Sequence, residues 1–241
     1  MADPLLQVEG IHTHIGKHHI LQGVSFEVYA GEVTVLLGRN GAGKTTTLRS
    51  IMGLLSPSQG RILFKNRAIH HMKPFDIARL GIGFVPEDRG LFNLLTVEEN
   101  FRVAMLQEAK KSQERLEFIL DVFPDLKKFW KAQAGILSGG QKQMLAIARP
   151  LVNENTLLLI DEPSKGLAPI IIDHLIEAIH RLKEHMMIIL VEQNFYMASK
   201  LGNVFHLFDD GRTVHKGQMV DLVQNEELKK KYLGISGAVS S

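Results

Sequence analysis

Cysteine is absent from the 241-residue chain, which excludes disulfides and thiolate metal sites and is compatible with a reducing compartment. Long hydrophobic runs are absent too: the longest aliphatic stretch, MMIILV at 186–191, is far shorter than the roughly 20 residues of a membrane-spanning helix. The opening residues, MADPLLQVEG, lack the basic and then apolar order of a signal peptide. We therefore expect a cytoplasmic chain that does not itself cross a membrane.

An excess of charge of either sign is also missing. The 28 Lys and Arg residues nearly balance the 26 Asp and Glu residues, for a formal net charge of +2. Proteins that follow a nucleic-acid backbone usually carry a clustered basic face, so no nucleic-acid partner is expected. There is no internal repeat or low-complexity linker, and 45% of the residues are hydrophobic, which indicates one compact folded unit.

Two strand patterns alternate along the chain. Segments at about 4–31 and 59–70 alternate apolar and polar residues between glycines, which predicts an antiparallel β layer with one solvated face. The runs EVTVLLG at 32–38, NTLLLIDEP at 155–163 and MMIILVEQN at 186–194 are continuously apolar, as in buried parallel strands. An amphipathic helix pattern separates the last two runs, and strand, helix, strand predicts a parallel sheet.

A helical segment interrupts this α/β pattern at about 90–150. Thr96 and Glu99 have the spacing of a capping box, and SQERLEFILDVF at 112–123 has apolar residues at helical spacing. We expect the helix that precedes Pro150 to kink or end near Arg149, because proline removes a backbone donor. The remaining core is assigned to about 32–58, 71–89 and 151–241. The charged segment ELKKKYLG at 227–234 is expected to be a solvated surface.

The sequence GRNGAGKT at 38–45 fits the pattern G-x-x-x-x-G-K-[ST] between a buried strand and a helix. Glycines let successive N–H groups point at phosphate oxygens, Lys44 reaches the β- and γ-phosphates, and the Thr45 hydroxyl faces Mg²⁺. An ordinary glycine-rich turn would not need this strand and helix context. The predicted phosphate-binding residues are Gly38, Arg39, Asn40, Gly41, Ala42, Gly43, Lys44, Thr45 and Thr46.

Two acids end the apolar run LLLIDEP. Asp161 stands where a neighbouring strand can offer a carboxylate to Mg²⁺, and Glu162 can polarise an attacking water as a general base. The sequence LSGGQ at 137–141 is a second phosphate-shaped element. Its hydroxyl, glycine N–H groups and helix dipole suit an anion, and the residues concerned are Ser138, Gly139, Gly140 and Gln141.

The phosphate loop, LSGGQ and LLLIDEP, in this order and spacing, resemble the nucleotide-binding subunits of ATP-binding-cassette (ABC) transporters over nearly the whole chain. The resemblance implies a P-loop NTPase core with a mainly parallel sheet, an antiparallel β layer and an inserted α-helical subdomain. It also implies ATP and Mg²⁺ as cofactors, and a head-to-tail dimer in which LSGGQ of one subunit closes over the ATP of the other. The second ABC ATPase subunit can be identical or different.

Four segments of the sequence are similar to the ATPase subunits of branched-chain amino-acid importers: VPEDRGLF, TVEENF, DEPSKGLAP and LVEQN. This implies an ATP hydrolase that powers import through separate transmembrane permease subunits, with a substrate-binding protein in the complete importer. The chain is then peripheral on the inner face of the cell membrane. The patch around Phe92, Leu94 and Leu95 is the candidate contact with the permease.

Some positions depart from the family pattern. Glu87 replaces a glutamine that meets Mg²⁺ or its water, and Gln193 replaces a histidine, so it can hydrogen-bond the γ-phosphate without carrying charge. Ile15 replaces the aromatic residue that stacks on adenine, and Ala168 replaces an aspartate of the dimer contact. The predicted catalytic residues are Glu162, Lys44 and Gln193, and the predicted metal ligands are Thr45, Asp161 and Glu87.

Alternative interpretations fit less well. A soluble ABC-type clamp or switch acting on nucleic acid or protein needs a coiled coil, a second cassette or a basic face, and a small-molecule P-loop kinase leaves LSGGQ without a role. The histidines around a predicted hairpin turn suggest a metal site, but they lack supporting carboxylates, so solvated turn residues are favoured. These histidines are His12, His14, His18 and His19.

Overall fold

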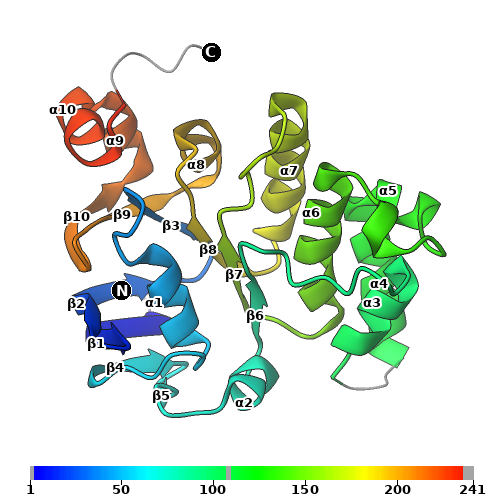
Figure 1. Ribbon diagram of the computed structural model, residues 1–241, viewed down its shortest axis with the longest axis horizontal. Helices are drawn as coiled ribbons and strands as arrows, with labels where there is room; N and C mark the ends of the chain where they lie inside the picture. The colour runs from blue at the N-terminus through cyan, green and yellow to red at the C-terminus, as the bar shows by residue number, and fades with distance from the viewer. Residues whose placement is uncertain (1–2, 107–109, 236–241) are drawn as a thin grey trace.

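Two β sheets form the framework of the chain, of which the computed structural model describes residues 3–106 and 110–235 (Figure 1). The smaller sheet has four antiparallel strands in the order β2-β1-β4-β5. The larger sheet has six strands in the order β10-β9-β3-β8-β7-β6, of which only β10 runs antiparallel to its neighbour. The strands are β1 (Leu6–Ile15), β2 (His18–Val28), β3 (Val33–Gly38), β4 (Gln59–Phe64), β5 (Arg67–Ala68), β6 (Ile82–Val85), β7 (Leu157–Asp161), β8 (Met187–Val191), β9 (Val204–Asp209) and β10 (Arg212–Gln218).

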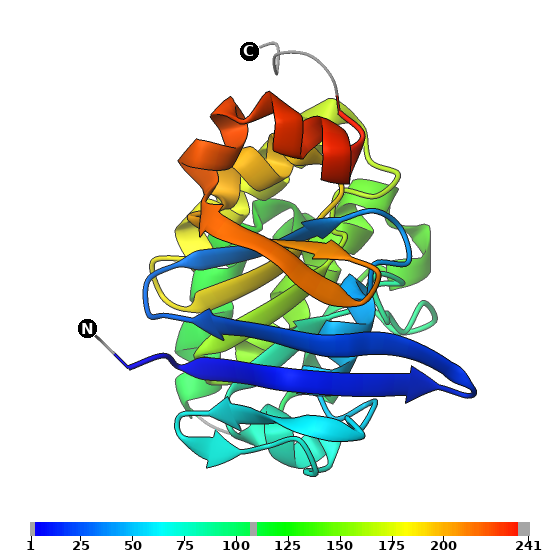
Figure 2. The same cartoon turned by 90° about the vertical axis from the view of Figure 1, so that its left-hand side faces the viewer.

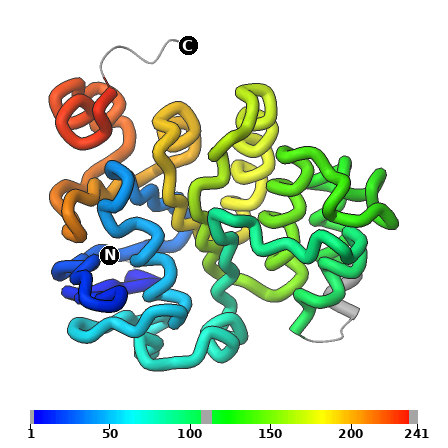
Figure 3. The backbone as a smooth tube through the Cα atoms, in the orientation of Figure 1, coloured from blue at the N-terminus to red at the C-terminus, as the bar shows by residue number. Residues whose placement is uncertain are grey.

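The helices form two groups, a helical lobe and the helices of the core. Helices α3 to α6 lie together beside the larger sheet, and Figure 3 follows the chain from β6 into this lobe and back to β7. The later helices α7 to α10 belong to the core part of the chain. The helices are α1 (Lys44–Ile51), α2 (Pro74–Arg79), α3 (Val97–Ala104), α4 (Lys110–Val122), α5 (Pro124–Lys128), α6 (Gly139–Ala148), α7 (Pro169–Leu182), α8 (Phe195–Leu201), α9 (Met219–Gln224) and α10 (Glu226–Leu228).

The larger sheet separates two buried hydrophobic clusters. Alternate residues of a strand face opposite sides, so Val35 and Leu37 join the cluster on the helical side while Leu36 joins the cluster toward the smaller sheet. Helix α1 packs in the second cluster through Leu48 and Ile51. Figure 2 shows the two sheets as separate layers. Burial on both faces explains why the central strands have continuous apolar runs.

The predicted fold class is confirmed: a mainly parallel sheet, an antiparallel β layer and a helical insertion are all present. The helix of LSGGQ ends as expected, because α6 stops at Ala148 and continues as a 3-10 turn over Arg149–Val152 that contains Pro150. Strands β9 and β10 were not predicted from the sequence. In the part of the chain that is described, no helix is long and apolar enough to cross a membrane.

The expectation that segment 227–234 is solvated is wrong at one position. Lys229 is 1% exposed, and its ammonium donates to the carbonyl of Val223 and pairs with Glu226. It also lies 5.7 Å from the ring centroid of Phe195. A buried lysine is tolerated where such partners replace water, and here they fasten the C-terminal helices to α8.

Helix α3 begins with the predicted capping box. The Thr96 hydroxyl accepts from the Glu99 N–H (3.2 Å), and the Glu99 carboxylate accepts from the Thr96 N–H (2.7 Å). We predict that Thr96→Ala lowers the free energy of unfolding by about 1 kcal/mol, because the N–H of Glu99 loses its side-chain acceptor. Urea denaturation measures the change, and Thr96→Ser, which keeps the hydroxyl, is the control. Equal midpoints for Thr96→Ala and the wild type contradict the prediction.

Candidate nucleotide site

The candidate site lies at the carboxyl edge of the parallel sheet. Strand β3 ends at Gly38 and leads into the phosphate loop, and β7 ends at Asp161 opposite Val191 of β8. The register also pairs Leu36 with Val191, so the ends of the three strands lie side by side. In open α/β sheets, ligands bind at this edge, outside the carboxyl ends of the strands. The parallel register therefore brings together segments far apart in sequence.

The phosphate loop has a backbone that only glycine adopts readily. Gly38 and Gly43 have φ angles of 151° and 101°, and a Cβ on Gly38 would lie 2.3 Å from the carbonyl oxygen of Phe208. The Lys44 ammonium donates to the carbonyls of Gly38 (2.9 Å) and Arg39 (3.1 Å). Burial lowers the pKa of Lys44, although the nearby carboxylates act in the opposite direction. The loop thus forms a closed cradle that ends in a buried cation.

Two of the predicted metal ligands are in contact. The Thr45 hydroxyl donates to Asp161 Oδ1 (3.1 Å), while Asp161 Oδ2 is buried without a hydrogen-bond partner in the described structure. Burial raises the pKa of Asp161 to about 6, and the charges of Glu162 and Glu87 act in the same direction. An orphaned carboxylate oxygen beside a hydroxyl is a donor set that suits Mg²⁺, which binds oxygen.

No group of three or more His, Asp or Glu side chains in the described residues could hold a metal ion by itself. This observation is compatible with Mg²⁺ that arrives with a nucleotide, because Mg²⁺ binds through one or two carboxylates while phosphates and waters supply the other ligands. The hairpin histidines contact one another instead: His12 and His19 nitrogens lie 3.0 Å apart, and the rings of His14 and His19 stack at 4.3 Å.

Glu162 and Gln193 meet across the ends of β7 and β8. The Gln193 amide donates to the Glu162 carboxylate (2.5 Å) and to the Asn40 side-chain oxygen of the phosphate loop (2.5 Å). Glu162 has a φ of 46°, a left-handed conformation that is uncommon outside glycine and typical of strained functional positions. One amide group therefore connects the phosphate loop, the general-base candidate and the loop after β8.

The sequence patterns did not predict a role for Glu192, because this residue directly follows an apolar strand. It is 1% exposed, and its carboxylate accepts from the N–H and hydroxyl of Ser164 and from the N–H groups of Gln193 and Asn194, at 2.9–3.0 Å. A charged residue directly after a buried strand was the available signal. Its hydrogen bonds fix the loops that carry Glu162 and Gln193.

The phosphate loop opens onto a cavity of about 300 Å³. Glu87 and Glu162 both line it, and Glu87 forms an ion pair there with Lys165. The sequence predicts no role for Lys165. Ile15 does not line this cavity, is 43% exposed and ends strand β1. The full lining is Ile20, Asn40, Gly41, Gly43, Lys44, Thr45, Thr46, Glu87, Glu162 and Lys165.

The LSGGQ residues lie outside that cavity. They open α6, which lies beyond α7 from the phosphate loop in Figure 1. Ser138 and Gln141 form a second capping box: the Ser138 hydroxyl accepts from the Gln141 N–H (3.3 Å), and the Gln141 side-chain oxygen accepts from the Ser138 N–H (3.0 Å). A Cβ on Gly140 would lie 2.7 Å from Ile171, so glycine allows close packing on α7. Within one chain the two phosphate-shaped motifs do not meet.

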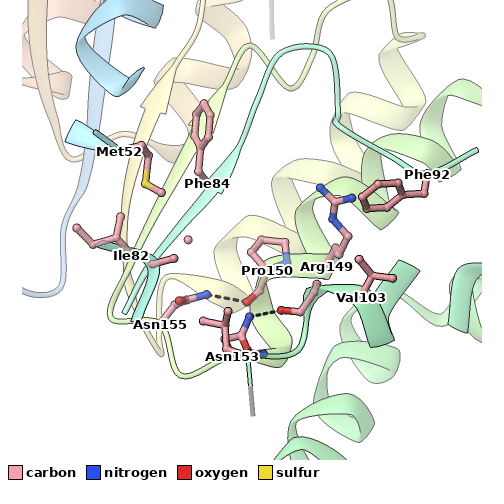
Figure 4. Close-up of a pocket in the computed structure, with 13 residues that line it drawn as sticks. Met52, Ile82, Phe84, Phe92, Val103, Arg149, Pro150, Asn153 and Asn155 are labelled. Carbon is pink, nitrogen blue, oxygen red and sulfur yellow. Dashed lines mark hydrogen bonds between the residues drawn. The ribbon is translucent and has the colours of Figure 1, made fainter. Parts of the chain in front are cut away.

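A second cavity, of about 340 Å³, lies between the helical lobe and β6 (Figure 4). Its lining is mainly apolar and includes Phe92 and Val103. Arg149 donates to the carbonyl of Gly90 (2.5 Å), and its guanidinium lies 5.7 Å from the Phe92 ring centroid. Phe92, which lines this cavity, is 49% exposed, and Leu94, two positions further along the chain, is 83% exposed. We call this surface the lobe groove.

A parallel sheet with this loop and these acids at its carboxyl edge defines a P-loop ATPase fold. The ABC transporter family model matches residues 21–165. The chain is 38% identical over 232 residues to the high-affinity branched-chain amino acid transport ATP-binding protein BraG of Pseudomonas aeruginosa, which covers 95% of this chain and 100% of that protein. The chain therefore belongs to the ABC transporter family, as an ATP-hydrolysing subunit.

Other comparisons agree with this assignment. A probable branched-chain amino acid transport ATP-binding protein, LivF of Archaeoglobus fulgidus, is 35% identical over 220 residues, or 90% of this chain and 93% of that protein. A solved ATP-binding subunit of an ABC transporter is 31% identical with a TM-score of 0.80, over 95% of this chain and 96% of that one. The predicted family is confirmed, and the match extends over most of the chain.

The buried Asp161 makes the stability of the chain depend on pH. Its folded pKa of about 6 lies above its ordinary value of 3.8, so ionising it above pH 6 costs the folded state roughly 3 kcal/mol. This cost disappears as the pH falls toward 4. We predict that Asp161→Asn raises the free energy of unfolding by about 2 kcal/mol at pH 8 and by almost nothing at pH 4. Urea denaturation of the nucleotide-free chain checks this, and a destabilised variant at pH 8 contradicts it.

Proposed function

We propose that two copies of this chain, or this chain and a related ABC ATPase, close around two ATP molecules and drive the import of branched-chain amino acids. The transport path lies in separate transmembrane permease subunits, with a substrate-binding protein in the complete importer. The chain is bound peripherally to those subunits on the inner face of the membrane. Its end-to-end similarity to BraG, with the phosphate loop, Asp161 and Glu162 brought to one edge, carries the proposal.

The residues of the site have separate roles in phosphoryl transfer. The loop N–H groups and Lys44 hold the phosphates, while Thr45 and Asp161 hold Mg²⁺, which when bound neutralises phosphate charge. Glu162 accepts the proton of the water that attacks the terminal phosphate. Gln193 orients that carboxylate through its amide, and its contact with Asn40 connects it to the phosphate loop. ADP is the leaving group.

The signature residues serve the ATP of the other subunit. Ser138 and Gly139 are exposed at the start of α6 and lie away from the cavity of their own chain, so an anion that reaches them comes from another molecule. The N-terminus of α6 offers N–H groups and a positive partial charge. A head-to-tail dimer gives both phosphate-shaped motifs a role.

The lobe groove is where the permease docks. It combines an apolar lining with exposed Phe92 and Leu94, a composition that suits an apolar segment of a partner. Arg149 links this surface to the Glu87 loop through the carbonyl of Gly90, and Arg89 of that loop donates to Gln143 of α6 (2.9 Å). A partner in the groove therefore touches segments that lead to both nucleotide-binding motifs.

We predict that Glu162→Gln forms a dimer when ATP and Mg²⁺ are added, because the variant keeps its shape but cannot accept the water proton, so ATP persists. Adding Ser138→Arg is expected to abolish the dimer, since a bulky cation blocks the start of α6. Light scattering measures the mass in solution, with the nucleotide-free chain as control. A variant that binds ATP yet stays monomeric contradicts the composite site.

We predict that the wild-type chain restores leucine uptake in a Pseudomonas aeruginosa strain lacking BraG, and that Glu162→Gln does not. Leu94→Asp is expected to lower uptake about tenfold while ATP-dependent dimerisation persists, because a charge in an apolar docking surface weakens only the contact with the permease. Val220→Asp, at another exposed apolar position on α9, is the control (62% exposed).

Two results of the uptake experiment contradict the proposal. If the chain assembles with the membrane subunits and hydrolyses ATP without leucine uptake, the assignment to branched-chain amino acids is wrong. If Leu94→Asp supports wild-type uptake, the lobe groove is not the docking surface. Radiolabelled leucine and immunoblotting of the membrane fraction separate these results from failed assembly.

A further inference from the structure

Lys165 is a second lysine in the phosphate cavity, and it sits in the loop that follows β7. We propose that Lys165 holds Glu87 while the site is empty and moves to the terminal phosphate when ATP binds. The inference rests on the proposed function, because it presupposes that this cavity receives the phosphates of ATP. It adds a nucleotide-binding residue that the phosphate loop and the two acids do not account for.

A fixed turn places Lys165 beside the general-base candidate. The Lys165 N–H donates to the carbonyl of Glu162 (3.2 Å), and Ser164 between them is held by its two hydrogen bonds to the buried Glu192. The backbone of Lys165 is thus part of a rigid loop. Its side chain is 64% exposed, so the ammonium can change partner without moving that loop.

The ammonium of Lys165 lies between two carboxylates of the cavity. It pairs with Glu87, 78 positions away in sequence, and lies 4.0 Å from a Glu162 oxygen. The hydrogen bond that Lys165 donates to Glu87 raises the pKa of Lys165, so the lysine stays charged. In the nucleotide-free chain this cation offsets negative charge that would otherwise repel a triphosphate.

The two lysines of the cavity differ in their exposure and in their hydrogen-bond partners. Lys44 is 4% exposed and donates to two carbonyls of the phosphate loop, so its position is set by the loop itself. Lys165 reaches the same cavity from the side of Glu162, where the proposed function puts the terminal phosphate. Lys165 is therefore the cation that distinguishes a triphosphate from a diphosphate.

The exchange replaces one charge-assisted hydrogen bond with another. A phosphate oxygen and a carboxylate oxygen are both strong acceptors for an ammonium, so Lys165 can leave Glu87 without losing a partner. Glu87 is then free to face the divalent cation that accompanies ATP. We therefore expect the ion pair between Glu87 and Lys165 to break when ATP binds.

Calorimetric titration of the whole chain with ATP and with ADP, in excess EDTA, tests the inference without using catalysis. Lys165→Met is expected to weaken ATP binding about tenfold, the loss of one exposed charge-assisted hydrogen bond, and to change ADP binding less than about twofold. Lys165→Arg, which keeps the charge, is expected to stay near the wild type. The matched control is Lys128→Met, since Lys128 forms a surface ion pair with Asp125 on the helical lobe and is 71% exposed.

A second pair of variants separates transfer to phosphate from simple neutralisation of Glu87. In a Glu87→Gln background, Lys165 has lost the nearer of its two carboxylate partners, and Lys165→Met is still expected to weaken ATP binding about tenfold if the ammonium contacts phosphate. A loss of less than about threefold in that background overturns the inference, because Lys165 then serves Glu87 alone.

Nucleotide binding by the wild-type chain distinguishes a failure of the proposed function from a failure of the inference about Lys165. A wild-type chain that binds neither nucleotide contradicts the proposed function and the inference together. If the wild type binds ATP and Lys165→Met leaves the ratio of ATP to ADP affinity unchanged, the inference alone is wrong. An equal loss for both nucleotides also overturns it, since a contact with the terminal phosphate affects only ATP.

Discussion

The buried carboxylate of Glu192 is the interaction on which the geometry of the site depends. A charge inside a protein is tolerated when hydrogen bonds replace its water, and Glu192 accepts four of them from the loops that follow β7 and β8. These bonds join two loops that are 28 positions apart into one rigid unit. Glu162, Lys165 and Gln193 project from that unit, so the relative positions of their backbones are fixed before any ligand arrives.

Electrostatics explains why the site needs such a frame. Asp161, Glu162 and Glu87 gather at one edge of the sheet, where burial and, to a smaller extent, the charges of Glu162 and Glu87 disfavour the ionised state of Asp161. The folded chain tolerates this strain because its core is extensive, with buried clusters on both faces of the larger sheet. Functional sites commonly lower stability in this way, and the divalent cation of the proposed function would offset the carboxylate charge.

The sequence predicted what local pattern encodes. Continuous apolar runs identified the parallel strands β3, β7 and β8, and Pro150 marked the end of α6, because burial and backbone chemistry act within a few residues. The pair of Glu87 and Lys165 could not be predicted, since only the fold brings these positions together. Strand β9 was missed because His206 interrupts its apolar run. That ring is 3% exposed, and burial lowers its pKa to about 4, so it is neutral and packs as an apolar group.

The capping box of α6 has a consequence for how the start of this helix responds to anions. The N–H of Ser138 is already occupied by Gln141, and the N–H of Gln141 by the Ser138 hydroxyl. Free phosphate or sulfate must displace these internal bonds to reach these two N–H groups, which weakens the binding of small anions at this helix start. In the proposed dimer, a nucleotide held on the second subunit arrives at high effective concentration and can compete. In the proposed dimer, the capping box therefore favours an anion presented by the second subunit over a free anion of the same charge.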